Sequence, residues 1–462
     1  MMYFFSGLGG AGTLPLAYIL KGMGHDIAWS DRGRDHGQNP AKFAWLEKEW
    51  PKAYAQDGSG LHALAGQISA VIPSGSVEKD VPEMKAAHDL NLKITKRPAL
   101  LAELFNAARL GVSIAGTSGK TTTTGMTGYM LQQLGQDPTV MNGGVFRNFA
   151  DQNPYCCAMV GKSGIFVTES DESDGSIALY RPQVAVLTNV TLDHKSMDEL
   201  RALFAAYLAT APRAVLNIDD PETAALAASY KGEAITYGLQ NQAARLYASN
   251  ITLRPDGSAC TVRDSKSGKS ITLNLAVLGK HNISNALAAL GVAVALELDL
   301  ADAAKALGSF TGIQRRLEVI GQKNGITVID DFGHNPDKIA ASLAALRSFE
   351  GRLLVLFQPH GFGPIRTMRH ELVESFATGL AQGDKLYMPE PFYAGGTVDR
   401  SVTSQHLVDD LKAKGIDASV GPSRDALKPA ILAEAKPGDR VVVMGARDDT
   451  LADYARSLLA AL

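Results

Sequence analysis

Short apolar runs alternate with longer stretches of helical periodicity along the whole chain. Most of the apolar runs end at glycine or at polar residues, as buried parallel strands do when a helix follows. The chain opens on such a unit, with a strand over residues 2–6, a glycine turn and a helix over residues 14–21. Further strands are predicted at residues 27–30, 70–72, 112–115, 164–168, 184–190, 214–218, 327–329, 353–357, 385–388 and 440–444.

The alternation falls into three successive blocks, which predict three α/β domains. We place them at residues 1–107, 108–312 and 313–462. Between residues 245 and 278 the pattern changes to alternating strands with turn signals at Asp256-Gly257 and Ser267-Gly268. This region is expected to form a small antiparallel sheet attached to the central domain.

A glycine loop between a strand and a helix opens the central domain. Such a loop offers backbone N–H donors, one lysine charge and one hydroxyl, which suit the β- and γ-phosphates of ATP and a magnesium ion. Ile114 stands where the full phosphate-loop pattern has glycine, so the strand–loop–helix context supports the assignment. The expected ATP-binding residues of the loop are Gly116, Thr117, Ser118, Gly119, Lys120, Thr121 and Thr122.

Acidic residues and a histidine follow two other strands of the central domain. The run Glu169–Asp174 begins where one strand ends, and the carboxyl ends of parallel strands meet at one edge of a sheet. A carboxylate of this run is therefore expected to bind magnesium beside the phosphate loop. His194 is expected to join a second metal site. A solvated acidic loop and a structural histidine are the alternative interpretations.

The first predicted strand runs into the sequence GLGGAG at residues 7–12, and the second ends at Ser30 and Asp31. Small residues at this position let the backbone and a helix N-terminus approach phosphate groups. The fold class predicted for the whole chain is therefore α/β. It comprises a Rossmann-like N-terminal domain, a central P-loop ATPase domain with a small antiparallel sheet, and a Rossmann-like C-terminal domain.

Charge and composition exclude several classes of partner. The formal net charge is −3, without the basic excess that indicates a nucleic-acid surface. No apolar run reaches the roughly 20 residues that span a bilayer. The three cysteines have no metal-type spacing and suit a reducing compartment. We expect a cytoplasmic protein with no nucleic-acid or membrane partner.

Taken in order, six segments resemble the Mur ligase family. They are GTSGKTTTT at residues 116–124, ESDESD at 169–174, TNVTLDH at 188–194, GKHNISNALAA at 279–289, FTGIQRR at 310–316 and DDFGHNP at 330–336. The resemblance covers essentially the whole chain. Within the family, the chain is most similar to the UDP-N-acetylmuramate–L-alanine ligases, through GLGGAG, Ser30-Asp31, DESD and QPH at residues 358–360.

The resemblance implies a ligase that uses ATP and Mg²⁺ to activate the carboxylate of UDP-N-acetylmuramate as an acyl phosphate. The enzyme, a monomer or homodimer, would join that group to an amino acid, L-alanine by expectation, in peptidoglycan precursor synthesis. The implied catalytic residues are Lys120, His194 and Arg316. The implied metal ligands are Thr121, Glu172 and His194, with Glu169 in reserve. Beyond the phosphate loop, the implied ATP contacts are Asn285, Arg315, Arg316, Asp331 and His334. The implied UDP-sugar contacts are Gly9, Gly10, Gly12, Asp31 and Ser74, and the implied amino-acid contacts are His360, Arg366 and Arg447.

The sequence departs from the family pattern at three places, one of which is the segment Gly445–Asp449, where the family more usually has small residues and asparagine. Ser118 replaces a histidine of the phosphate loop, and the segment Gly361–Arg366 lacks an arginine-rich run. The lost guanidinium groups would have paired with the amino acid's carboxylate, and Arg447 is the candidate replacement. No lysine lies in residues 196–211, so no carbamylated lysine is predicted.

Two alternatives stay open. One is a Mur-type ligase with another acyl or amine substrate, in muropeptide recycling or outside cell-wall synthesis. The other is a non-catalytic nucleotide-binding homologue.

Overall fold

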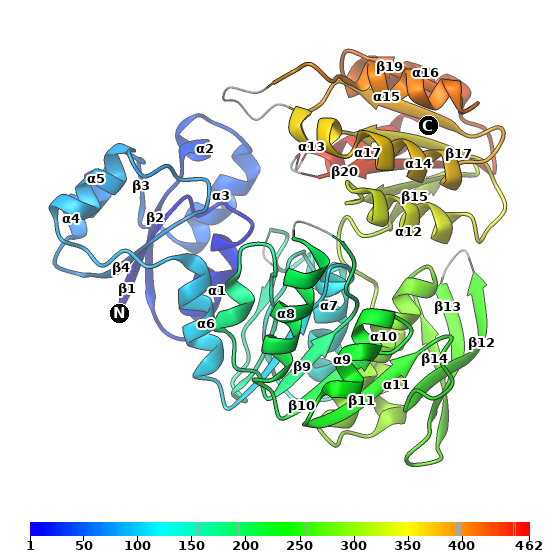
Figure 1. The fold of residues 1–462 in the computed structure, drawn as a ribbon. Helices are drawn as coiled ribbons and strands as arrows, with labels where there is room; N and C mark the ends of the chain where they lie inside the picture. Colours follow the sequence, from blue (N-terminus) through cyan, green and yellow to red (C-terminus); the bar gives the residue numbers. More distant parts are fainter. Residues whose placement is uncertain (156, 193–194, 255–256, 393–398, 447, 449) are drawn as a thin grey trace. The chain divides into compact units, whose positions relative to one another are not determined.

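Three β-sheets with their flanking helices form the framework of the computed structural model (Figure 1). The structure describes residues 1–155, 157–192, 195–254, 257–392, 399–446, 448 and 450–462. The chain divides into two compact units. The first comprises Met1–Ile251, Ala259–Asn274 and Ser284–Thr311, and the second comprises Thr252–Ser258, Leu275–Ile283 and Gly312–Leu462.

The first sheet is parallel, with strand order β3-β2-β1-β4. Neighbouring residues of β1 face opposite sides of this sheet, and Phe4 and Phe5 are both fully buried. Two separate apolar clusters contain them, so both faces are covered, as a parallel sheet requires. The elements are β1 (Met2–Ser6), α1 (Thr13–Gly22), β2 (Asp26–Ser30), α2 (Arg32–Asp35), α3 (Pro40–Glu49), β3 (Ala53–Tyr54), α4 (Ser59–Leu64), β4 (Ile68–Pro73), α5 (Pro82–Asp89) and α6 (Arg97–Asn106).

The central sheet brings the predicted phosphate loop and the acidic run to one edge. Over the described residues its order is β14-β13-β12-β11-β10-β9-β5-β8-β6-β7. The strand β5 lies between β8 and β9 and is parallel to both, with Ile114 opposite Glu169 and Ala115 opposite Leu187. The loops that follow these three strands therefore begin side by side.

The strands of this sheet are β5 (Leu110–Ala115), β6 (Thr139–Met141), β7 (Ala158–Met159), β8 (Ile165–Glu169), β9 (Val184–Leu187), β10 (Arg213–Asn217), β11 (Glu233–Gly238), β12 (Leu246–Arg254), β13 (Gly257–Asp264) and β14 (Ser270–Leu275). Its helices are α7 (Lys120–Gln133), α8 (Met197–Leu208), α9 (Pro221–Ser229), α10 (Lys280–Ala295) and α11 (Leu300–Gly308), with 3₁₀ turns η1 (Arg147–Phe149) and η2 (Ser176–Leu179).

The strands predicted between residues 245 and 278 are present, but they do not form a sheet of their own. The strand β12 pairs with β11, with Tyr237 opposite Leu246, so β12, β13 and β14 extend the central sheet. The alternating pattern identifies such strands but does not specify which existing edge they join.

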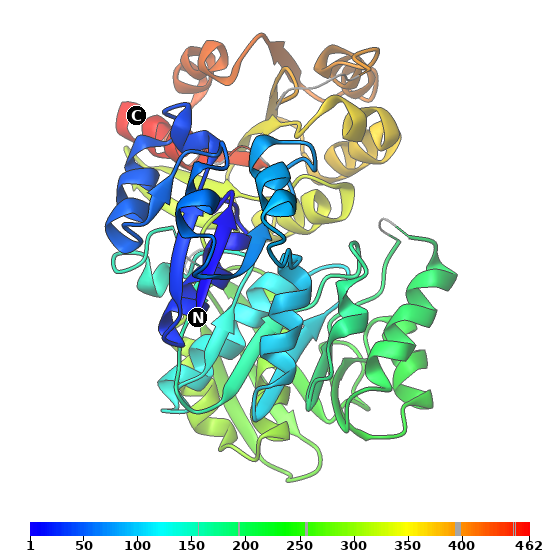
Figure 2. The same ribbon diagram turned by 90° about the vertical axis from the view of Figure 1, so that its left-hand side faces the viewer.

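The third sheet has the order β15-β16-β20-β17-β18-β19. Neighbouring residues of β17, Val355 and Leu356, belong to two different buried clusters. Helices flank this sheet on both sides (Figure 2). Helices α12, α14 and α15 supply the first cluster, and α16 and α17 supply the second. The elements are β15 (Glu318–Lys323), β16 (Ile326–Asp331), α12 (Pro336–Leu346), β17 (Leu353–Gln358), α13 (Phe362–Thr367), α14 (Arg369–Gly379), β18 (Lys385–Pro389), α15 (Ser404–Ala413), β19 (Ala418–Gly421), α16 (Arg424–Glu434), β20 (Arg440–Gly445) and α17 (Leu451–Ala461).

Each sheet lies within one of the three segments predicted from the sequence, so the mixed α/β fold with three sheet-bearing regions is confirmed. The boundaries at residues 107 and 312 stay predictions. Within the described ranges, no helix has both the length and the apolar content needed to cross a membrane.

A buried carboxyl group lies beneath the ends of β1 and β2. Glu83, on α5, is fully buried and accepts hydrogen bonds from the hydroxyls of Ser30, at 2.8 Å, and Ser6. Its Oε1 atom has no hydrogen-bond partner among the described residues. Burial raises the pKa of Glu83 to about 7; the two serine bonds oppose this rise, and the charges of Asp35 and Asp57 add to it.

The stability of the protein should therefore depend on pH through Glu83. Its pKa is raised from an ordinary value of 4.5, so the folded protein holds a proton there that the unfolded chain has lost. The resulting stabilisation is fully present below pH 4.5 and is lost as the pH rises to about 7, by up to about 1.4 kcal/mol per pH unit. Glu83→Gln cannot ionise and should lack this loss. Urea unfolding of both proteins across this range measures it, and a pH-independent difference between them contradicts the raised pKa.

Candidate active site

The phosphate loop connects buried β5 to α7, and two of its glycines have left-handed backbone conformations. Gly116 has φ +128° and Gly119 has φ +86°. A Cβ atom on Gly116 would lie 2.2 Å from Thr188 Oγ1, and one on Gly119 would lie 2.7 Å from Asn285 Oδ1. Both positions therefore require glycine for conformation and for space.

Residues at the end of β9 hold the loop in place. Asn189 Oδ1 accepts hydrogen bonds from Thr117 Oγ1 at 2.7 Å and from the backbone N–H of Ser118 at 2.9 Å. The Thr188 hydroxyl donates to Ser118 O at 2.7 Å. The segment that the sequence singled out for its histidine thus braces the loop. His194 itself lies outside the described residues.

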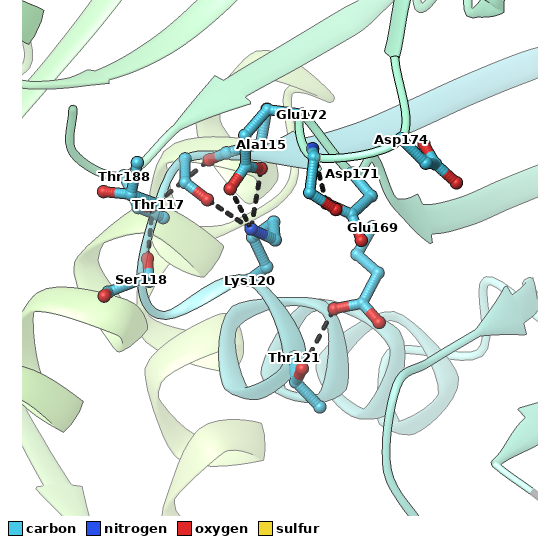
Figure 3. A network of polar contacts seen from close by, with 12 residues as sticks. Ala115, Thr117, Ser118, Lys120, Thr121, Glu169, Asp171, Glu172, Asp174 and Thr188 are labelled. Atoms are coloured by element: carbon cyan, nitrogen blue, oxygen red, sulfur yellow. Dashed lines mark hydrogen bonds and ion pairs between the residues drawn. The ribbon is translucent and has the colours of Figure 1, made fainter. Parts of the chain in front are cut away.

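Lys120 forms an ion pair with the acidic run. Its Nζ atom lies 2.8 and 3.0 Å from the two carboxylate oxygens of Glu172, and it donates to Gly116 O at 2.7 Å (Figure 3). The side chains are 16% and 5% exposed, so the pair is largely screened from water. The lysine charge is therefore held at the mouth of the glycine loop, where a phosphate group would lie.

Thr121 faces the other glutamate of the run. Its hydroxyl donates to Glu169 Oε2 at 2.9 Å (Figure 3). One hydroxyl oxygen and one carboxylate at a phosphate loop are a typical protein contribution to a Mg²⁺ site, whose other ligands are phosphate oxygens and water. This geometry favours Glu169 over Glu172 as the metal ligand. Among the described residues, no group of three or more His, Cys, Asp or Glu side chains forms a metal cluster.

One segment of the site, Asn142-Gly143, was not predicted from the sequence. It follows β6, which is paired to β8. A Cβ atom on Gly143 would lie 2.1 Å from Glu169 Oε1 and 2.9 Å from Thr121 Oγ1. The buried Oδ1 atom of Asn142 has no hydrogen-bond partner in the described part of the chain. An Asn-Gly-Gly sequence after a strand was the available signal, but it is also typical of an ordinary turn.

Asn285, near the start of α10, lies against the loop. Its Oδ1 atom accepts a hydrogen bond from the Thr123 hydroxyl at 3.2 Å. The side chain of Asn285, an implied ATP contact, therefore lies against Gly119. Thr122 is half-buried in the first turn of α7.

The predicted UDP-sugar residues also lie together, at the ends of β1, β2 and β4. Asp31 accepts hydrogen bonds from the backbone N–H groups of Gly9, at 2.7 Å, and Gly33, at 2.8 Å. A Cβ atom on Gly10 would lie 3.0 Å from Ser74 Oγ. These residues surround the first glycine loop.

The second compact unit holds the remaining candidates, beginning with the two arginines. Arg315 and Leu317 have left-handed backbones, with φ +60° and +46°. The Arg315 guanidinium donates to Gly445 O at 2.7 Å and Asp448 O at 3.3 Å and lies 3.4 Å from Asp330. Arg316 lies over the Phe332 ring, 4.8 Å from its centroid. Both arginines stay predicted phosphate contacts.

The carboxylate of Asp331 secures this turn. It accepts hydrogen bonds from the backbone N–H groups of Leu317 and Gly333, both at 2.9 Å, and from Ser342 Oγ at 2.7 Å. Asp331 is 4% exposed. It therefore fixes the backbone next to Arg316, whatever further contact it makes.

The histidine candidates are close to each other. The His334 and His360 rings are 4.9 Å apart in a T-shaped arrangement. Burial, followed by the charge of Lys338, lowers the pKa of His334 to about 3, so its ring is neutral at neutral pH. Arg366 forms an ion pair with Asp399. Arg447 lies outside the described residues.

Comparisons with known proteins show to which family the chain belongs. The Mur ligase middle domain matches residues 114–293, and the Mur ligase, glutamate ligase domain, matches residues 315–447. The UDP-N-acetylmuramate–L-alanine ligase of Maricaulis maris is 33% identical, over 98% of this chain and 95% of that protein. The ligase of the same name from Rhizobium meliloti is 34% identical, over 96% and 93%. The chain belongs to the Mur ligase family.

Solved structures show the same fold for this Mur ligase. The UDP-N-acetylmuramate–alanine ligase of Thermotoga maritima aligns with a TM-score of 0.80 at 23% identity, over 100% of this chain and 98% of that one. The murein peptide ligase of Psychrobacter arcticus aligns with a TM-score of 0.70 at 24% identity, over the same shares. The family resemblance read from the six motifs is confirmed.

The short distance between Gly143 and the Glu169 carboxylate gives a test of the role of Asn142-Gly143 in this Mur ligase. In Gly143→Ala, the new methyl group would displace the Glu169 carboxylate from Thr121. We expect ATP-dependent turnover to fall at least about tenfold, which corresponds to about 1.4 kcal/mol in the barrier. Gly66→Ala is the matched control, since no atom lies within 4 Å of a Cβ there. Steady-state ADP formation measures both, and wild-type turnover in Gly143→Ala contradicts this role.

Proposed function

We propose that this protein is an ATP-dependent ligase that joins L-alanine to the carboxylate of UDP-N-acetylmuramate, a step of peptidoglycan precursor synthesis. Two relatives named for that activity, 33% and 34% identical, align over at least 96% of the chain. The observation that carries the proposal is the double pairing of Lys120 with Glu172 and Thr121 with Glu169 at one sheet edge. It joins a phosphate-binding loop to carboxylates suited to a metal.

The first step would form an acyl phosphate. A carboxylate oxygen of the sugar's acyl group attacks the γ-phosphorus of ATP, and ADP leaves. Lys120 and the backbone N–H groups of the loop would bind the phosphates as their charge shifts. Thr121 and Glu169 would hold Mg²⁺, which would neutralise charge on the β- and γ-phosphates. Arg316 is proposed as the arginine that contacts the γ-phosphate.

The second step would form the amide. The amino group of the amino acid attacks the acyl carbon, a tetrahedral intermediate collapses, and the C–O bond to phosphate breaks. We assign the UDP-sugar to Gly9, Gly10, Gly12, Asp31 and Ser74. We assign the amino acid to His360, Arg366 and Arg447, and the nucleoside of ATP to Asn285, Asp331 and His334. His194 is retained as a proposed second metal ligand.

The proposal is tested by phosphate release from ATP with UDP-N-acetylmuramate and single amino acids. We expect release to require both the nucleotide sugar and L-alanine, and Lys120→Ala to abolish it at a temperature at which the variant is still folded. Release that no amino acid stimulates contradicts the proposal, and near-normal turnover in Lys120→Ala contradicts the assignment of the loop.

Glu169→Gln and Glu172→Gln should differ in the Mg²⁺ concentration that half-maximal turnover requires. Glu169→Gln removes a charge from beside Thr121, so the Mg²⁺ concentration for half-maximal turnover should rise at least about tenfold. Glu172→Gln mainly removes the partner of Lys120 and should alter the KM for ATP instead. Titration of Mg²⁺ at saturating ATP compares them. A larger Mg²⁺ shift in Glu172→Gln would reverse the assignment.

A further inference from the structure

Arg97 extends from the start of α6 along the first glycine loop. A Cβ atom on Gly12 would lie 2.8 Å from Arg97 Cδ, 2.9 Å from its Nε and 3.1 Å from its Cζ. The side chain therefore occupies the space that a residue larger than glycine would fill. This places the guanidinium group at the end of the loop Gly7–Gly12.

The same guanidinium faces the acidic run of the central domain. Its Nη2 atom lies 3.8 Å from Asp174 Oδ2. The positive charge of Arg97 also lowers the pKa of Asp171. Burial would raise the pKa of Asp171, but hydrogen bonds from Ser173 and the charges of Lys120 and Arg97 hold it below its ordinary value. Arg97 thus lies between the first glycine loop and the acidic run that pairs with Lys120.

The ion pair of Arg97 is weak compared with that of Lys120. Its 3.8 Å separation is too long for a hydrogen bond, and the two side chains are 30% and 39% exposed. Pairs of this kind contribute about 0–1 kcal/mol. Asp174 also accepts the backbone N–H of Ser176 at 2.8 Å through its other oxygen. An anion of suitable shape can therefore draw the guanidinium away from Asp174 at little cost.

We propose that Arg97 is a binding residue for an anionic group of the acyl substrate. The inference rests on the proposed function, in which the nucleotide diphosphate lies at Gly7–Gly12 and the reacting carboxylate lies near Lys120. A substrate that extends from Gly7–Gly12 to Lys120 would lie next to Arg97. The diphosphate and the carboxylate share the chemistry that a guanidinium recognises, with two parallel N–H donors to two oxygens.

The experiment measures the KM for UDP-N-acetylmuramate and for ATP in Arg97→Ala and Arg97→Lys. We expect the KM for the nucleotide sugar to rise at least about tenfold in Arg97→Ala. Arg97→Lys should recover only part of this loss, because lysine keeps the positive charge but cannot donate two parallel hydrogen bonds. The KM for ATP should stay within about twofold of wild type in both. Lys96→Ala is the matched control, since Lys96 is the neighbouring exposed cation.

Calorimetric binding of two nucleotide sugars identifies the anion without turnover. UDP-N-acetylglucosamine lacks the lactyl carboxylate of UDP-N-acetylmuramate. Equal weakening of both by Arg97→Ala identifies the diphosphate, and weakening of UDP-N-acetylmuramate alone identifies the carboxylate.

Unchanged binding of both sugars, with the KM within twofold of wild type, overturns the role of Arg97. If wild type binds the sugar but no amino acid supports turnover, the proposed function fails and the binding comparison still tests Arg97. If Arg97→Ala unfolds at a lower temperature than the assay, Arg97→Lys carries the test by the same criteria.

Discussion

The ion pair between Lys120 and Glu172 joins the loops that follow two neighbouring parallel strands, β5 and β8. It is largely buried, and burial of two charges costs desolvation energy that their attraction only partly offsets. Its value lies in position, because it holds an ammonium group where the glycine loop opens. We propose that a phosphate oxygen replaces Glu172 as the partner of Lys120 when ATP binds.

The other parts of the first unit follow from the same edge of the central sheet. The loop after β9 braces the glycine loop through Asn189, and the segment after β6 approaches Glu169 through Gly143. Four strand ends thus contribute to one small volume. Parallel strands make this possible because all their carboxyl ends lie on the same side.

The second unit presents its arginines differently, from a strained turn. Left-handed conformations at Arg315 and Leu317 each cost of order 1–3 kcal/mol and persist only where the surroundings enforce them. Asp331 supplies that constraint through the backbone of Leu317, and Glu318 Oε2 accepts the backbone N–H of Arg315 at 2.9 Å. Both guanidinium groups lie over the Phe332 ring, and that of Arg315 also donates to the backbone carbonyl of Gly445.

The strands and the phosphate loop could be predicted because apolar runs and glycine spacing are local signals. The pairing of Thr121 with Glu169 rather than with Glu172 could not, because Glu169 ends β8 while Glu172 lies in the loop that follows, and a run of acidic letters does not specify which carboxylate faces the helix. Asn142 and Gly143 were missed because their contacts depend on the pairing of β6 with β8. The pairing of β12 with β11 could not be predicted either, because the edge that a strand joins depends on tertiary structure.

The phosphate loop is assigned to the transfer of a phosphoryl group from ATP to a carboxylate. Oxygen transfer tests it most directly: UDP-N-acetylmuramate labelled with ¹⁸O in its carboxylate is converted with ATP and L-alanine, and the released phosphate is analysed by mass spectrometry. An acyl phosphate requires the phosphate to carry one labelled oxygen, because the C–O bond breaks when the amine attacks. Unlabelled phosphate from a reaction that forms the amide would contradict the account.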